Sequence, residues 1–268
     1  MEHSLKLIPR ELKNYNFPEA SFLSKEQQIA YEEACKQFSN GKARESLKIP
    51  QKGSNLFKIL LLNQIGIRTV TLLELDFIAE QNPDFLKGFY EDSPSVVLRS
   101  NRNSYSTNDY LAKSLAKLIS KKNFNQPIII NGLKIKEDNN SPYGLNFEAA
   151  DNFEFFKAPD FSHKNNTRRF SRINPDYTIE FDDKASRTLY TRNSGLSGLC
   201  LGRDLDLYSG SANLANSNDN GRVVVVSAKG TSQKILDEQV AKLQKIRDEE
   251  IADINKRYKQ AESVLKNK

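Results

Sequence analysis

Apolar side chains recur at helical spacing in the first part of the chain. Ser24 opens the sequence SKEQ, in which its hydroxyl can accept the backbone N–H of Gln27 and the Gln27 side chain can reach back. Apolar residues follow at Ile29, Ala30, Ala34 and Phe38, and Asn40-Gly41 is a stop signal. We therefore predict a helix over residues 24–40. The same spacing predicts a buried helix over residues 55–63 and another that starts at Ser106.

Shorter apolar runs indicate strands. Residues 96–98 and 127–130 predict two of them, and Asn131-Gly132 is a turn signal that would join the second to Leu133–Ile135 in a hairpin. Residues 68–73 fit either a strand or the approach to a helix. We interpret the aromatic stretch 144–159 as core packing, with a base-stacking platform as the alternative, and the basic stretch 163–175 as a loop.

Residues 231–268 contain neither Gly nor Pro and carry two apolar stripes. The first consists of Leu236, Val240, Leu243 and Ile246, and the second of Ile251, Ile254, Tyr258, Ala261 and Leu265, spaced as in a coiled coil. We predict a long amphipathic helix. Because one helix cannot hide such a stripe from water, it must pack either on the N-terminal helices or on a second copy of the chain, which would give a homo-oligomer.

Leucines alternate with small or polar residues between positions 199 and 207. Leu199, Leu201, Leu205 and Leu207 share one parity, so in an extended run they would all face the core and the intervening residues would face outward. Residues 218–221 form a hairpin-type turn signal. Residues 223–226, all valine, predict a central strand that is buried on both faces.

The composition of this same stretch is unusual. The 44 residues between Lys184 and Lys229 contain no Lys, Glu, Gln, Met or Trp, although the chain has 26 Lys. Every residue type found at the outward and turn positions can be encoded by a codon that ends in a pyrimidine. The first two bases of such a codon may be any bases. Randomising the adenines of an asparagine codon produces this set. These candidate binding positions are Gly198, Cys200, Gly202, Arg203, Asp204, Asp206, Tyr208, Gly210, Ser211, Ala212, Asn213, Asn216, Asn218, Asp219 and Asn220.

The pattern GLSxLxLxxxLxLxSxxxxLAxSxxxGRVVVV over residues 195–226 resembles the variable region of target proteins of diversity-generating retroelements. Residues 6–28 and 56–63 resemble the N-terminal part of that family. In these systems an error-prone reverse transcriptase copies a template repeat and alters its adenines, and the copy replaces the variable region. The resemblance implies that variable side chains form a ligand-binding surface on a stable scaffold.

The resemblance also implies a fold class and a domain organisation. We expect an α+β protein with a helical N-terminal segment over residues 1–54 and a C-type lectin-like domain over residues 55–228. The variable region would cover about residues 190–222, and the amphipathic helix residues 229–268. The implied function is hypervariable binding of an unidentified protein or surface ligand, with no catalytic residues, cofactor or metal.

Two other function classes compete with binding. An enzyme would rest on Asp204 and Asp206, which share a parity and could pair for acid–base work or hold a metal. Both lie at positions interpreted as variable, which disfavours fixed chemistry. A nucleic-acid-binding protein would use Arg168, Arg169 and Arg172 together with the net charge of +6, although acidic residues interleave with the basic ones along the chain.

Composition narrows the field further. Cys35 and Cys200 are far apart with no metal-binding spacing, so we expect free thiols. His3 and His163 are isolated, and no glycine-rich phosphate loop occurs. No apolar run approaches the roughly 18 residues of a membrane span. The N-terminus lacks the apolar core of a signal peptide, so we expect a cytoplasmic or virion-associated protein.

Overall fold

The computed structural model describes residues 4–6, 19–47, 53–100, 106–120, 125–210, 213–216 and 220–227. Nearly all of them belong to one compact unit, made of Met1–Leu7 and Ala20–Ser227. The second unit, Ile8–Glu19 with Ala228–Lys268, lies outside the described residues except for Glu19. The helix expected over residues 231–268 therefore also lies outside them, and the compact unit alone is considered below.

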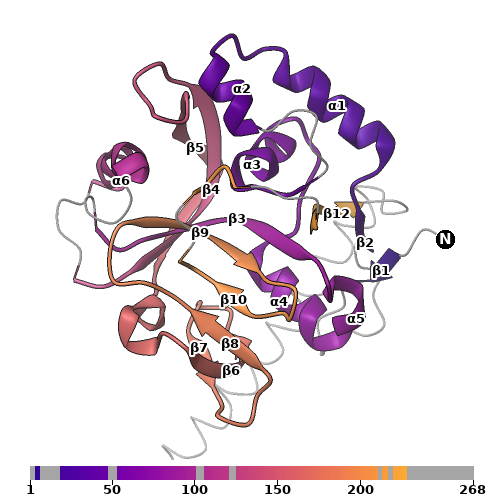
Figure 1. Ribbon diagram of the computed structural model, residues 1–268, viewed down its shortest axis with the longest axis vertical. Helices are drawn as coiled ribbons and strands as arrows, with labels where there is room; N and C mark the ends of the chain where they lie inside the picture. The colour runs from indigo at the N-terminus through magenta and orange to yellow at the C-terminus, as the bar shows by residue number, and fades with distance from the viewer. Residues whose placement is uncertain are drawn as a thin grey trace, which may run out of the picture. The chain divides into compact units, whose positions relative to one another are not determined.

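Helices and strands are mixed along the described chain (Figure 1). The helices are α1 (Lys25–Cys35), α2 (Gly41–Leu47), α3 (Leu56–Gln64), α4 (Leu72–Gln81), α5 (Pro83–Leu86) and α6 (Ser106–Leu118), with short 3-10 turns η2 (Pro159–Phe161) and η3 (His163–Asn165). The strands are β1 (Ser4–Lys6), β2 (Glu19–Phe22), β3 (Tyr90–Leu98), β4 (Ile128–Glu137), β5 (Leu145–Lys157), β6 (Arg168–Ile173), β7 (Ile179–Phe181), β8 (Arg187–Tyr190), β9 (Leu196–Leu201), β10 (Leu207–Tyr208), β11 (Gly221–Arg222) and β12 (Val224–Ser227). The unit is thus a mixed α and β fold, compatible with the expected α+β class.

One large sheet organises the unit. Its strand order is β5-β4-β3-β9-β10-β8-β6-β7, and β11 pairs with β3 beside this path. Strands β4 and β9 flank β3 in antiparallel ladders, and β10 pairs antiparallel with β9 and parallel with β8. A second sheet of three strands has the order β1-β2-β12.

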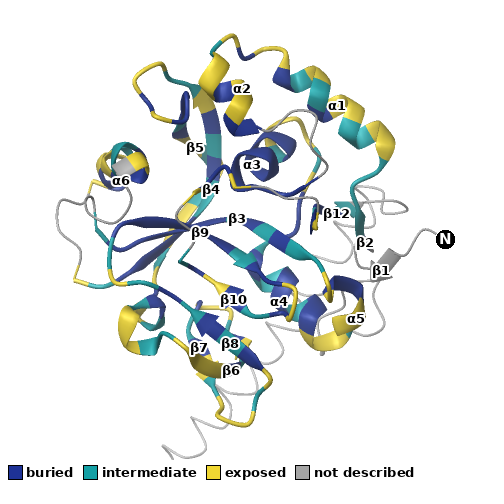
Figure 2. Ribbon diagram, in the orientation of Figure 1, coloured by how far each residue is buried: buried dark blue, intermediate teal, exposed yellow. Residues whose placement is uncertain are grey.

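Apolar side chains cover both faces of the large sheet. Along β3, Val96 and Leu98 belong to a core cluster shared with α1, α2, α3 and α6, whereas Val97 belongs to a second cluster shared with α4 and α5. Each face therefore carries its own helical layer. Figure 2 shows the consequence: α3 is buried throughout its middle, and α1 is exposed along its outer side.

Local helix signals predicted from the sequence are confirmed. Ser24 and Gln27 form the capping box of α1, with the Gln27 N–H donating to Ser24 Oγ at 3.2 Å. The helix ends at Cys35, earlier than expected, because Asn40 caps the next helix instead and its Oδ1 accepts the Lys42 N–H at 2.8 Å. Residues 68–73 contain a single β-bridge, Thr69↔Val225, and then the Thr71 cap of α4, so both alternatives hold in part.

The hairpin expected at Asn131-Gly132 is wrong. Strand β4 continues through both residues, and its register with β5 shifts between Asn131 and Leu133, which is a β-bulge. Gly132 has a φ of +65°, so the glycine serves the bulge rather than a turn. The actual chain reversal follows at Asp138, whose N–H donates to Gly144 O at 2.9 Å.

Three other expectations need correction. The basic stretch interpreted as a loop contains strand β6, which pairs with β7 and β8. Residues 224–227 lie in the small sheet rather than at the centre of the large one, although the strand is bonded on both sides, to β2 and to residues 68–70, and Val223, Val224 and Val225 are buried as expected. In the aromatic stretch Phe147 is core, but Phe155 is 41% exposed.

Candidate functional site

The leucine-rich run of the variable stretch forms a tight β-hairpin. Strands β9 and β10 pair with Leu207 opposite Leu201 and Tyr208 opposite Cys200. The chain turns between them, where the Leu205 N–H donates to Gly202 O at 2.9 Å and Leu205 has a φ of +66°. A continuous extended run over residues 199–207 is therefore wrong. All four leucines are nonetheless buried, because the hairpin returns Leu207 to the face that Leu201 occupies.

A buried arginine holds the open end of this hairpin. Arg99, at the end of β3, is 6% exposed, and its guanidinium donates to Ser197 Oγ at 2.9 Å, Ser209 O at 2.9 Å and Thr191 Oγ1 at 2.8 Å. Burial lowers the pKa of Arg99 to about 9. Ser197 and Ser209, two of the fixed serines of the pattern, are thus internal hydrogen-bonding groups rather than surface residues.

A second buried arginine holds the turn. Arg187 of β8 donates from Nε to Leu205 O at 2.9 Å, and its Nη2 lies 2.7 Å from Asp76 Oδ1 of α4. The same aspartate accepts the Ile173 N–H at 2.8 Å. Both ends of the hairpin are therefore fixed from outside by cations that water does not reach.

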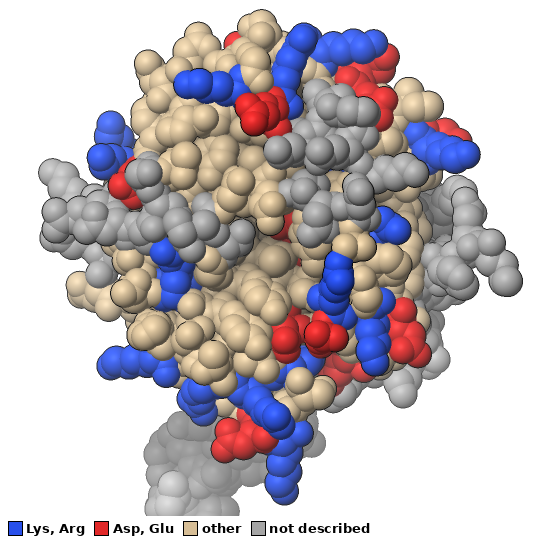
Figure 3. Space-filling model, viewed as in Figure 1, with Lys and Arg blue, Asp and Glu red and all other residues tan. Residues whose placement is uncertain are grey.

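Nine of the fifteen candidate binding positions are exposed or half-buried, five of them on this hairpin and four after it. Those exposed are Arg203, Asp204, Tyr208, Asn213, Asn216 and Asn220, and those half-buried are Cys200, Asp206 and Gly210. Ser211, Ala212, Asn218 and Asp219 lie outside the described residues. On the face seen in Figure 3, charged side chains of both signs lie mainly around the border.

Gly198 and Gly202 depart from the expectation that they face outward, because both are buried. A core side chain covers the first of these glycines, and a side chain at the rim of the hairpin covers the second. A Cβ on Gly198 would meet only Leu214 Cδ2, at 3.8 Å, which is ordinary contact distance. A Cβ on Gly202 would lie 2.5 Å from Cε2 of Tyr208, so the tyrosine ring occupies the space above this glycine.

Tyr208 forms an aromatic pair at the rim of the hairpin. Its ring stacks on Tyr190 of β8 with centroids 4.7 Å apart and an interplanar angle of 14°. Partial burial, and then the charge of Asp206, raise the pKa of Tyr208. Sequence analysis missed Tyr190 as a site residue, because only the parallel pairing of β8 with β10 brings it beside Tyr208.

Acidic groups lie beneath the same hairpin. Asp92 of β3 is opposite Cys200, and burial raises its pKa to about 7. Burial, followed by the charge of Asp92, raises the pKa of the Cys200 thiol well above its ordinary value. The thiol is therefore protonated at neutral pH and is a poor nucleophile. Cys35 and Cys200 are both free, as expected.

The residues of the competing hypotheses are arranged differently. Asp206 Oδ1 accepts the Thr188 N–H at 2.6 Å, while Asp204 is exposed on the turn. Within the described ranges no group of three His, Cys, Asp or Glu side chains is placed to hold a metal.

The three arginines of β6 are exposed but engaged locally. Arg172 lies 2.7 Å from Glu180, Arg169 Nη1 donates to Asp183 O at 3.5 Å, and Arg168 stacks 3.8 Å from the Phe181 ring. Acidic neighbours thus offset part of the basic charge that a nucleic-acid surface would need.

Comparison of the chain with protein-family models, with curated proteins and with solved structures found no match. Among the described helices, none has the length and apolar character needed to cross a membrane.

Proposed function

We propose that this protein is a hypervariable binding protein and that a diversity-generating retroelement diversifies the sequence of its ligand-binding surface. One observation carries the proposal. Among the described residues of 195–226, every fixed letter of the pattern is buried except Arg222 and Val226, which are half-buried; of the variable letters six are exposed, three are half-buried and only the two glycines at 198 and 202 are buried. Variation limited to the second set changes the surface and leaves the core intact.

The energetics of the two sets support this division. Truncation of a buried leucine costs roughly 2–5 kcal/mol, whereas a surface substitution away from special features changes stability by about 0.5 kcal/mol or less. The hairpin is also fixed by Arg99 and Arg187, which lie outside residues 195–226. A binding surface can thus vary without redesign of its support.

The residue types of the candidate binding positions suit recognition. Tyrosine supplies contact area with little loss of entropy, and serine, glycine and asparagine supply adaptable hydrogen bonds, as in antibody paratopes. A C-type lectin-like arrangement and self-association through residues 231–268 are part of the proposal. A second copy would make weak binding multivalent and so raise avidity.

The DNA that flanks the gene tests the proposed class directly. We expect a near-copy of codons 190–226 beside a reverse transcriptase gene, with adenines in the copy wherever the two differ. Differences scattered over all four bases, or the lack of both the copy and the polymerase gene, would contradict the proposal.

Two displayed libraries test the division between scaffold and surface. The first randomises the first two codon bases at Arg203, Asp204, Tyr208, Asn213 and Asn216. The matched control library treats Ser197, Leu199, Leu207, Ser209 and Leu214 in the same way. We expect most members of the first to resist protease and most of the control to be cleaved. Panning the first library on a purified protein such as lysozyme should then enrich binders. Equal protease sensitivity of the two libraries would refute the division.

A further inference from the structure

Two neighbouring strands of the large sheet, β3 and β4, have irregular pairing at the same level of the sheet. Strand β3 shifts register with β9 between Asp92 and Val96, and β4 shifts register with β5 between Asn131 and Leu133. The β3–β4 ladder ends at Val96↔Ile130, directly beside both irregularities. Ser95 Oγ, from the first bulge, donates to Asn131 Oδ1, from the second, at 2.7 Å. Bulges concentrate near binding and active sites, where they redirect side chains.

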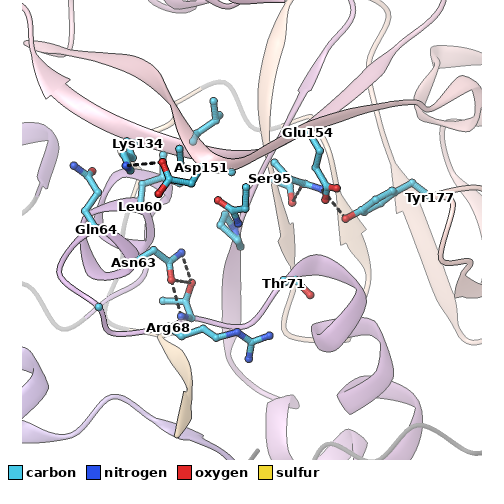
Figure 4. Close-up of a pocket in the computed structure, with 18 residues that line it drawn as sticks. Leu60, Asn63, Gln64, Arg68, Thr71, Ser95, Lys134, Asp151, Glu154 and Tyr177 are labelled. Atoms are coloured by element: carbon cyan, nitrogen blue, oxygen red, sulfur yellow. Dashed lines mark hydrogen bonds and ion pairs between the residues drawn. The ribbon is translucent and has the colours of Figure 1, made fainter. Parts of the chain in front are cut away.

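A cavity of about 450 Å³, with polar and apolar side chains in its lining, opens at this double irregularity. Its volume is in the range of small-molecule sites, about 300–1,000 Å³. In Figure 4, Lys134 and Asp151 lie at one end of the space, and Glu154 and Tyr177 at the other. Its other residues come from α3 and its connection to α4, from the two bulges and from β5, and none of them is a candidate binding position of the variable stretch.

The walls of this cavity are held in place by hydrogen bonds. The Gln64 side chain accepts the Ile135 N–H at 2.8 Å and donates to Ile135 O at 3.0 Å, which ties the end of α3 to β4. Asn63 Oδ1 accepts the Thr69 N–H at 2.8 Å. Asn131 Nδ2 donates to Tyr177 Oη at 2.7 Å. A cavity with such walls is formed before any ligand arrives, which reduces the ordering cost of binding.

The lining offers neutral polarity rather than net charge. Its two cations each face an anion: Lys134 lies 4.0 Å from Asp151, and Arg68 lies 2.5 Å from Glu74. Tyr177 Oη accepts a hydrogen bond from Asn131, so its own proton remains available to donate. The carboxylates of Asp151 and Glu154 keep acceptor capacity, because the lone pairs of a carboxylate exceed the contacts they make here.

We propose that this cavity binds a neutral, hydroxyl-rich small molecule of the size of a free mono- or disaccharide. Each hydroxyl is both donor and acceptor, so it can meet a carboxylate oxygen and a phenol or ammonium hydrogen in turn. The two cations and two carboxylates of the lining cancel in formal charge, so the cavity offers no excess of either sign to attract a charged ligand. The site is independent of the variable hairpin, so neither proposal depends on the other.

Saturation-transfer NMR and calorimetry on the full chain test this site. The probes are glucose, galactose, mannose, N-acetylglucosamine and sucrose, with glycine and inorganic phosphate as charged comparators. We expect at least one sugar to bind with a Kd of about 0.1–10 mM, the range of a small preformed polar site, and the comparators not to bind. Binding of glycine or phosphate alone, or of no probe, would overturn the proposal.

Matched variants on one hairpin place the binding in the cavity. Asn152→Leu and Asp151→Ala change exposed lining residues of β5, so the fold should persist. Each should weaken sugar binding at least about tenfold, or 1.4 kcal/mol. Glu148→Ala on the same strand removes an exposed partner of Lys136 outside the cavity and should leave the Kd unchanged. Equal affinity in all three variants would contradict the location, and loss of variable-surface binding with intact sugar binding would affect only the proposed function.

Discussion

The sheet contains two hairpins that are stabilised in opposite ways. Strands β9 and β10 share only two register pairs, but each is also paired on its outer side, β9 with β3 and β10 with β8. Strands β4 and β5 share nine register pairs, yet β5 is an edge strand. The interior hairpin is thus paired on both outer sides, whereas the edge hairpin has an outer partner only for β4, which pairs with β3. A site that must tolerate variation is therefore better placed on the first kind.

The side chains that support the two hairpins differ accordingly. Arg187, which holds the turn of β9–β10, is 8% exposed and pairs with Asp76 at 5%. On β4–β5 the corresponding contact is the surface pair Lys136–Glu148, with side chains 52% and 48% exposed. Charges removed from water are costly to leave unpaired, whereas exposed pairs contribute little.

The largest expected effect comes from breaking the buried pair. Arg187→Met leaves Asp76 buried without its cation and frees the Leu205 carbonyl, so we expect a loss of about 3–5 kcal/mol in the free energy of unfolding. Lys136→Met on the edge hairpin is the matched control and should cost less than about 1 kcal/mol. Urea unfolding of both variants measures the difference, and similar losses would remove the distinction between the hairpins.

Next in size is the bulge of the edge hairpin. Gly132 has a φ of +65°, and a Cβ there would lie 2.3 Å from Asn152 O, so Gly132→Ala should cost about 1–3 kcal/mol or more. Gly66 has a φ of +83° with nothing within 4 Å of a Cβ, so Gly66→Ala carries only the conformational cost of about 1–2 kcal/mol. If thermal unfolding ranks Gly66→Ala as the more damaging variant, the clash at the bulge is not the dominant cost.

These residues also show how far the sequence specifies the fold. The capping box of α1 was predictable, because all its contacts lie within four residues. Asn131-Gly132 was misread because the same left-handed glycine suits a turn and a bulge, and only the register with β5 distinguishes them. Strand β6 was missed because its outer positions are charged, as they are in a loop.

The candidate site was predictable to a similar degree. The parity of the leucines identified the buried face, since it is a property of the local chain. It did not reveal the turn, because Leu205 adopts a conformation that leucine rarely takes. The support from Arg99 joins residues about a hundred positions apart, so no local pattern encodes it. Tyr190 and Asp92 reach the hairpin only through strand pairing.

Asp92, on the strand beside the variable hairpin, predicts that the stability of the protein depends on pH. The pKa of Asp92 is raised from 3.8 to about 7, so between these pH values the unfolded chain has released a proton that the folded chain retains. Rising pH therefore favours unfolding over this window, so Tm should fall between pH 4 and pH 7. The change of Tm with pH should be smaller in Asp92→Asn. Burial also raises the pKa of Glu91, so part of the pH dependence should persist in this variant. An equal change of Tm between pH 4 and pH 7 in Asp92→Asn and in the parent protein would contradict the raised pKa of Asp92.

The smallest expected effect concerns whether variable positions act independently. The ring of Tyr208 lies over Gly202 and stacks on Tyr190. A side chain at position 202 would therefore occupy the same space as the tyrosine ring. Tyr208→Ser should cost about 0.5–1.5 kcal/mol through loss of the stack. Gly202→Ser should cost a similar amount because it displaces the same ring.

The double variant settles this point. Once Tyr208 is serine the space above position 202 is free, so Gly202→Ser should add almost nothing, and the double-mutant cycle should show a coupling of about 0.5–1.5 kcal/mol. Arg203→Ser combined with Asn216→Ser is the matched control, since both positions are exposed, and these changes should add to within about 0.5 kcal/mol. Additive costs at 202 and 208 would mean that the tyrosine ring moves aside freely. Coupling would mean that the surface offers fewer independent shapes than its number of variable positions suggests.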